Sequence, residues 1–469
     1  MATVGMNTDI TSLVNAIVAG DADQITGVAN ELVDGGAGTS ELIGRIGTIV
    51  AHSDSEGHVM LTLAAASMMA RWFVSLQHTL GQDPIDHRPE LPLLLQAAAV
   101  ATPAVQADYK AQKQVSYPEP LFPSELAEGQ TVNSALTRAI FENDTLTVER
   151  LLFGLYGTGA DYRTMCIRVY DAISTTFQRA GHPFMFAVRG FQLLDAIEWG
   201  TRAPDILHWL APHLPVHTQE PTWVETIRGF LAEPSHSLAS YRTRLAAPKE
   251  EQALPLRRLI LSDASMPQIC QGVYDALMKN GASSRGIGSV LALTATDLLQ
   301  QVGFGDNDDF VTAAHGLLYA SAVRNAVTQV QEVEALPLLF TAACYLHALH
   351  TEQPASTGTA QAGTPHSTVL GGGLIAPSLI ETLAEQLGAR DLNGAFATAH
   401  RYVLLDHDAR AMFAIIALAA TRGDAAADQG HTLQIVQAAG EEYLAWPAAL
   451  RDTNIDGLLH VALRAVTRQ

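Results

Sequence analysis

One arrangement of residues recurs four times along the chain and constrains its fold more than any other feature. Each copy has an acidic residue in a position typical of a helix cap or turn, then two apolar helical runs, then a histidine at or near the head of another helix. The acidic residues are Asp21, Asp144, Asp263 and Asp391, and the histidines are His58, His182, His315 and His431. A helical repeat that returns one imidazole per unit can direct all four toward a common axis.

The local context of these histidines is similar but not identical. His58, His182 and His431 directly follow a glycine, whereas His315 lies within a helical run. Glycine lets the chain bend into a helix without a side-chain clash. One such histidine alone is more often structural, but four at equivalent positions favour a transition-metal site. Tyr319, one turn after His315, could reach the same pocket, or it could pack in the core with a hydrogen-bonded hydroxyl.

The dominant periodicity of the chain is helical. Ile10, Leu13, Val14 and Ile17 follow the i, i+3, i+4, i+7 spacing of an amphipathic helix face. Extended alternation of apolar and polar residues is nearly absent, and no Asn-Gly or Asp-Gly turn is flanked by strand-like runs. The sequence therefore predicts an all-α fold, with four helical repeat units packed around a common core and a central metal site.

The predicted units belong to one domain and run over residues 6–130, 131–248, 249–352 and 376–469. Residues 353–375, between the third and fourth units, are rich in Gly, Ser, Thr and Pro. This composition predicts a flexible loop, which could be a lid over a site or only a connector.

The composition argues against several classes of protein. The formal net charge is −20 and no run of Lys and Arg occurs, so we expect no binding to nucleic acid or to an anionic membrane. The N-terminus lacks the pattern of a signal peptide, and the apolar run at residues 97–101 is too short to span a bilayer. We therefore expect a cytoplasmic protein. Its three cysteines are far apart, which predicts reduced thiols in the core.

The types of ligand in the sequence limit which metals the site could bind. Many imidazoles without a local cysteine motif favour iron, zinc, copper or manganese. A catalytic metal needs an open coordination position, and four histidines with one carboxylate would leave an octahedral iron one position for O₂ or substrate. We find no Gly-x-Ser-x-Gly elbow, phosphate-binding loop or Gly-x-Gly-x-x-Gly fingerprint, so serine hydrolases and nucleotide-dependent enzymes have little support.

Two stretches of the chain resemble questin oxidase-like proteins, a family of fungal anthraquinone ring-cleaving oxygenases and their bacterial relatives. They are the run at residues 181–195, which begins Gly181-His182-Pro183-Phe184, and the run at residues 315–324, which begins His315-Gly316-Leu317. The resemblance extends over nearly the whole chain through the repeat pattern. It implies an all-helical oxygenase with non-haem iron that acts on a polyketide quinone or hydroquinone in secondary metabolism.

The resemblance also implies a set of ligands. In the fungal type four histidines and a carboxylated lysine hold the metal, and the histidines correspond to His58, His182, His315 and His431. The lysine has no counterpart, because no lysine occurs between His315 and His431. Where relatives have Ile-Lys-Thr, this chain has Ile-Glu-Thr, so the resemblance points to Glu381 as a carboxylate ligand, although a solvated helix residue is an equal alternative.

Three hypotheses follow for the function. The first is an oxygenase in which Fe(II), or else Zn or Mn, is bound by the four histidines and O₂ reacts with an aromatic substrate. Its electrons would come from the substrate or from a partner protein, because the chain lacks the ligands of a Rieske cluster. The second is an α-solenoid scaffold without catalysis, in which the histidines are interhelical contacts. The third is a zinc-dependent hydrolase or isomerase.

Overall fold

The computed structural model describes residues 9–82, 88–111, 115–197, 202–244, 248–303, 307–352 and 376–468. These residues form helices and connecting segments, and no strand occurs among them. The all-α prediction is therefore confirmed. The predicted flexible loop at 353–375 lies outside the described residues.

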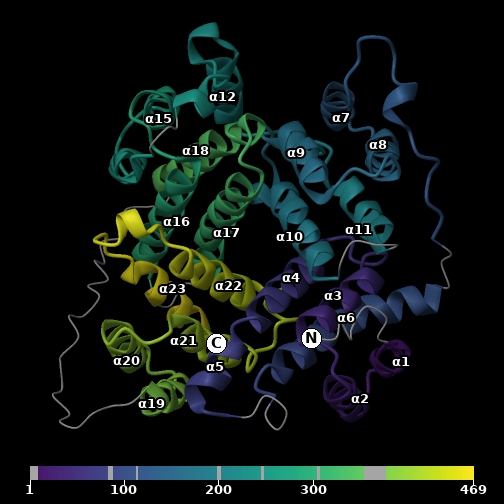
Figure 1. Ribbon diagram of the computed structural model, residues 1–469, viewed down its shortest axis with the longest axis vertical. Helices are drawn as coiled ribbons and strands as arrows, with labels where there is room; N and C mark the ends of the chain where they lie inside the picture. Colours follow the sequence, from purple (N-terminus) through teal and green to yellow (C-terminus); the bar gives the residue numbers. More distant parts are fainter. Residues whose placement is uncertain are drawn as a thin grey trace.

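The helices of the first half of the chain follow one another mostly through short connections, with a longer one between α6 and α7 (Figure 1). Their bounds are α1 Thr11–Ala19, α2 Ala22–Asp34, α3 Thr39–Val50, α4 His58–Ala70, α5 Phe73–Leu80, α6 Leu91–Ala111, α7 Val132–Phe141, α8 Thr145–Gly157, α9 Tyr162–Ile173, α10 His182–Ala196, α11 Ala203–Leu210 and α12 Thr222–Ala232.

The second half of the chain is built in the same way. Its helices are α13 Tyr241–Arg244, α14 Pro255–Ile260, α15 Met266–Tyr274, α16 Ser284–Gln301, α17 Asn307–Val330, α18 Pro337–Glu352, α19 Ala376–Gly388, α20 Leu392–Leu404, α21 Ala409–Ala420, α22 His431–Leu444 and α23 Asp456–Thr467.

The predicted acidic positions lie where helices begin or the chain turns. The carboxylates of Asp21, Asp144 and Asp391 accept backbone N–H groups at the starts of α2, α8 and α20, which satisfies donors that have no partner inside the helix. Asp263 lies in a turn before α15, where Ser265 is the capping residue instead. The prediction of a cap or turn is confirmed at all four positions.

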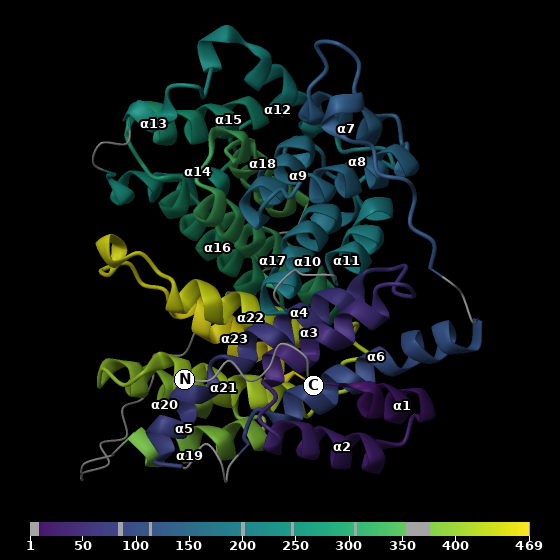
Figure 2. The same cartoon turned by 45° about the vertical axis from the view of Figure 1, so that its right-hand side comes forward.

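Four helices form a closed cycle in the centre of the molecule. Helix α4 packs against α10 and α22, and α17 packs against the same two helices from the other side. Figures 1 and 2 show these helices surrounded by the others. The cycle brings α4, near the start of the chain, against α22, near its end. An open solenoid, in which each unit contacts only its sequence neighbours, would not bring them together.

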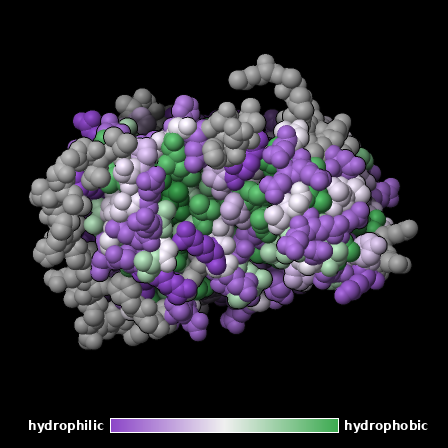
Figure 3. Space-filling model, turned by 90° about the horizontal axis from the view of Figure 1, so that it is seen from below, coloured by the Kyte–Doolittle hydropathy of each residue, from purple (hydrophilic) through white to green (hydrophobic). Residues whose placement is uncertain are grey.

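Two apolar segments of the core pass the length and composition test for a membrane span. They are His58–Leu80 and Val333–Glu352, and 72% and 78% of their apolar windows is buried inside the protein, as expected of core helices. Cys166, Cys270 and Cys344 are buried, as predicted, and the Sγ atoms of Cys270 and Cys344 lie 3.7 Å apart. Seen from below, the surface is mostly hydrophilic, with some hydrophobic residues exposed near its middle (Figure 3).

Candidate metal centre

The four predicted histidines meet in the central cycle of helices. The imidazole of His182 lies 5.0 Å from those of both His58 and His315, measured between ring centroids. His431 closes the ring, at 5.2 Å from His315 and 5.7 Å from His58. His58, His182 and His431 are the first residues of α4, α10 and α22, and His315 lies inside α17, as predicted.

The glycine before each helix-initial histidine is required by its surroundings. Gly57, Gly181 and Gly430 all have positive φ, between +72° and +84°, a conformation that costs little only for glycine. A Cβ atom at Gly57 would also overlap the ring of Phe186, and one at Gly181 the ring of Tyr319. These three bends therefore bring neighbouring helices into closer contact than a side chain would allow.

The residues that contact these glycines follow one rule. Phe186 lies four residues after His182, and Tyr319 lies four residues after His315. Gly430 obeys the same rule, because its Cβ would overlap Thr62, four residues after His58. Each of these glycines thus packs against the residue one turn beyond the histidine of a neighbouring central helix, and the contact sets the distance between adjacent imidazoles.

Two aspartates that the sequence analysis did not single out shape the starts of α4 and α22. Asp54 accepts hydrogen bonds from the backbone N–H groups of Gly57 and Met60, at 3.0 and 2.9 Å. Asp428 accepts from those of Gly430 and Thr432, at 2.9 and 3.0 Å. Their sequence signal is an aspartate shortly before each Gly-His pair, which is a typical helix-capping arrangement.

The backbone orients three of the imidazoles. Nδ1 of His315 lies 2.8 Å from the carbonyl oxygen of Val311, and Nδ1 of His431 lies 2.6 Å from that of Asp428. Nδ1 of His182 is hydrogen-bonded to the carbonyl oxygen of Arg179. A carbonyl can only accept, so each Nδ1 donates and each Nε2 keeps a free lone pair. Nε2 of His431 is buried and has no hydrogen-bond partner.

Burial keeps the imidazoles neutral. Loss of hydration, together with repulsion between the imidazoles, lowers the pKa of His58 and His315 to about 4 and that of His182 to about 3. Burial also lowers the pKa of His431, although Asp428 opposes this shift. A neutral imidazole with an available lone pair is the form that binds a metal.

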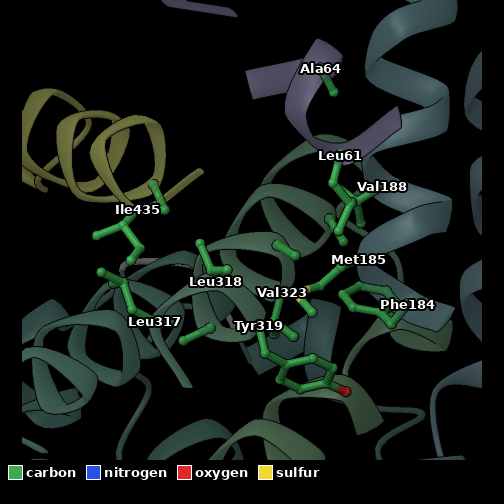
Figure 4. Packing of buried hydrophobic residues seen from close by; sticks show 14 of the residues in the cluster. Leu61, Ala64, Phe184, Met185, Val188, Leu317, Leu318, Tyr319, Val323 and Ile435 are labelled. Atoms are coloured by element: carbon green, nitrogen blue, oxygen red, sulfur yellow. The ribbon is translucent and has the colours of Figure 1, made fainter. Parts of the chain in front are cut away.

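A layer of apolar side chains lies one turn beyond the imidazoles. Leu61, Met185 and Leu318 each follow a ring histidine by three residues, and each is 3% exposed. Figure 4 shows these side chains between the central helices. The layer separates the imidazoles from a buried ion pair, in which Nε of Arg324 donates to Oε1 of Glu442 at 2.8 Å.

The donor atoms of the imidazoles are not arranged as they would be in a loaded site. Among the described residues, no group of three or more His, Cys, Asp or Glu side chains is arranged to hold a metal ion. Bonds of about 2.0–2.1 Å from one ion to the imidazole nitrogens would need the rings to turn inward. The donor types, the neutral rings and the unpartnered Nε2 of His431 fit a transition metal, whereas the present orientation of the donor atoms does not.

The predicted fifth ligand lies elsewhere. Glu381 is exposed on α19, whose buried face carries Leu379, Ile380, Leu383 and Leu387. This helix packs against α5, α20, α21 and α23, and not extensively against any helix of the central cycle. The structure thus does not bring Glu381 to the imidazoles, because the face that carries it points outward, and we leave it out of the candidate site.

Tyr319 lies beside the site in an aromatic environment. Its ring covers Gly181 and meets the rings of Phe177 and Phe184, with centroids 5.5 and 5.6 Å away. Its hydroxyl is buried without a hydrogen-bond partner, and burial raises its pKa well above the usual range. These neighbours favour packing over the predicted catalytic role, and the hydroxyl stays protonated.

Comparison with known proteins does not identify a relative. No family model, no curated protein and no solved structure matches this chain.

Proposed function

We propose that His58, His182, His315 and His431 bind one transition-metal ion and that the protein is an oxygenase. The observation that carries this proposal is the closed ring of four imidazoles, with neighbouring centroids 5.0–5.7 Å apart. Polar groups removed from water are costly unless they are satisfied. Two of the imidazoles are buried, two are half-buried, and the ring contains no carboxylate, so we expect the four to share a partner. A cation is the partner that four neutral imidazoles suit best.

We further propose that the predicted repeat units are arranged around this axis. The proposed boundaries at 130/131 and 248/249 fall between helices, and each unit supplies one helix of the central cycle. The recurring contact between a glycine and the fourth residue after a neighbouring histidine supports a common arrangement, since Phe186, Tyr319 and Thr62 occupy equivalent positions. The third unit departs from it, because Ala314 stands where the others have glycine.

Fe(II) is the metal we propose first, with Zn and Mn as alternatives, because the ligands are imidazoles and no cysteine is among them. When bound, iron would supply the activation of O₂. The chain would contribute neutral ligands held by backbone carbonyls and a layer of apolar side chains that excludes water from one side of the site. The substrate class, an electron-rich quinone or hydroquinone whose ring is cleaved, comes from the resemblance to questin oxidase-like proteins.

The test is a metal analysis of single variants. The protein is purified anaerobically after growth with added iron, and its metal content is measured by mass spectrometry for the wild type and for each of the four His→Ala variants. We expect about one ion per chain in the wild type and a loss of about tenfold or more in each variant. His78→Ala is the matched control, because His78 is exposed at the end of α5 and its removal should leave the metal in place.

The same series separates the alternatives. Metal that survives all four changes would overturn the site, and a metal-free wild type would favour a non-catalytic scaffold. Zinc in place of iron would favour a hydrolase or isomerase. O₂ consumption with hydroquinones then tests the oxygenase itself. Tyr319→Phe belongs in that assay: loss of turnover with unchanged metal content would establish a catalytic role for the hydroxyl, whereas packing alone predicts little change.

A further inference from the structure

A pocket of about 920 Å³ opens beside the ring of histidines. It is bounded by the start of α17, the ends of α19, α21 and α23, and the start of α22. Its lining includes His431 and Val311, whose carbonyl oxygen is bonded to the imidazole of His315. The volume is within the range of sites that hold small organic ligands. The pocket therefore connects the surface with one member of the ring, His431, and with the backbone carbonyl that orients a second, His315.

Three arginines line this pocket. Arg390 follows α19, Arg422 follows α21 and Arg468 follows α23. Within the described part of the chain, none of the three forms a direct ion pair with a carboxylate, although the charge of Asp428 opposes the lowering of the Arg468 pKa by burial. Nε of Arg468 is buried without a hydrogen-bond partner, and its guanidinium lies over the ring of Phe310, 4.8 Å from the centroid. The pocket thus holds the exposed guanidinium groups of Arg390 and Arg422 and that of Arg468, whose Nε–H has no hydrogen-bond partner.

The acidic residues of the pocket are engaged differently. The Asp424 carboxylate accepts the backbone N–H groups of Ala426 and Ala427, at 3.0 and 3.2 Å, and Asp428 caps the start of α22. The start of α22 carries a partial positive charge that offsets the Asp428 carboxylate, whereas Asp424 lies in the turn before this helix. Asp308 sits in the first turn of α17. The guanidinium groups are therefore the charged groups left to bind a ligand.

We propose that this pocket admits the substrate and that the substrate carries a carboxylate on its aromatic body. The inference rests on the proposed function and adds a substrate class to it. Guanidinium groups bind carboxylates through paired, charge-assisted hydrogen bonds, so the acid would be held by the exposed Arg390 and Arg422, with Arg468 in the same lining. The aromatic body would then extend toward His431.

The experiment compares two ligands that differ only in charge. Anthraquinone-2-carboxylate and the neutral anthraquinone-2-carboxamide are titrated into the metal-free full-length protein, and binding is followed by quenching of tryptophan fluorescence. We expect the acid to bind about tenfold more tightly than the amide at low ionic strength, and this preference should shrink as salt screens the charges. The double variant Arg390→Gln/Arg422→Gln should bind the acid about fivefold to tenfold more weakly and the amide unchanged.

Arg451→Gln is the matched control, because Arg451 is 84% exposed beside Asp452 and away from the pocket. Both substituted arginines are exposed at helix ends, so the variants should fold, which circular dichroism checks. Equal binding of acid and amide, or a double variant that behaves like the control, would overturn the inference. Because the titration needs no metal, a protein that holds no iron but still prefers the acid would contradict the proposed function alone.

Discussion

At the scale of single residues, the glycines before the histidines decide whether the imidazoles can meet. A glycine in a left-handed turn is common at helix ends, but Gly57, Gly181 and Gly430 also lie against a neighbouring central helix. The side chain they lack would push that helix away. The geometry of the imidazole ring therefore depends on glycines, which have no side chain and cannot bind a metal through one.

The prediction at this scale concerns Gly181→Ala. The new methyl group would meet the ring of Tyr319 at a φ of +84°, so we expect destabilisation by about 2–4 kcal/mol from backbone strain and overpacking together, and a loss of metal binding. Gly159→Ala is the control, because Gly159 has a φ of +77° but open space around it, and it should cost only about 1 kcal/mol. Urea unfolding and metal analysis measure both effects, and equal costs for the two variants would contradict the argument.

At the scale of elements, α17 and α22 are joined by a buried ion pair beneath the apolar layer. Arg324 is 5% exposed and Glu442 is fully buried, and burial raises the pKa of the Glu442 carboxyl despite the nearby guanidinium. A pair of this kind is costly to desolvate and costly to break. It fixes how the two helices face each other, one of which carries His315 and the other His431.

Replacing one residue of the Arg324–Glu442 pair should therefore destabilise the protein more than replacing both residues. We expect Glu442→Leu to lower the free energy of unfolding by about 3–5 kcal/mol, because it leaves the Arg324 guanidinium buried without its charge partner. The double variant Arg324→Met/Glu442→Leu should recover a large part of this loss. Urea denaturation of the two single variants and the double variant gives the coupling energy, and a purely additive result would show that the pair does not act as a unit.

At the scale of the whole molecule, the chain closes on itself. Helix α22 contacts α4 and α17, and Gln434 Nε2 donates to the carbonyl oxygen of Gln429 at 3.1 Å and to Oγ1 of Thr62 at 3.4 Å. These contacts join segments more than 350 residues apart in the sequence. Helix α22, near the end of the chain, therefore belongs to the same core as α4, near its start.

This closure predicts the behaviour of a shortened chain. A fragment that ends at residue 352 lacks α19 to α23 and would expose the apolar faces of α4 and α17, so we expect it to lose the cooperative urea transition of the full chain. An open helical array would instead keep a cooperative transition after losing its last unit, because each unit depends only on its neighbours. Circular dichroism of the two proteins distinguishes these outcomes.

Much of this structure was predictable, and the errors have physical causes. Helical periodicity predicted the all-α fold, and the recurrence of one histidine per unit predicted that His58, His182, His315 and His431 would come together. The assignment of Glu381 relied on a short phrase. The apolar stripe of Leu379, Leu383 and Leu387 places residue 381 on the opposite side of a helix with 3.6 residues per turn. Helical periodicity therefore predicts an exposed Glu381.

The sequence by itself determined which residues are helical, where helices begin and which imidazoles belong together, because periodicity and capping are local properties of the chain. Only the tertiary structure decided that the histidine helices form a closed cycle, that each glycine packs against a neighbouring helix, and that Arg390, Arg422 and Arg468 share one pocket. These arginines follow three different helices and have no common local pattern. Their proximity comes from long-range packing, which no local spacing records.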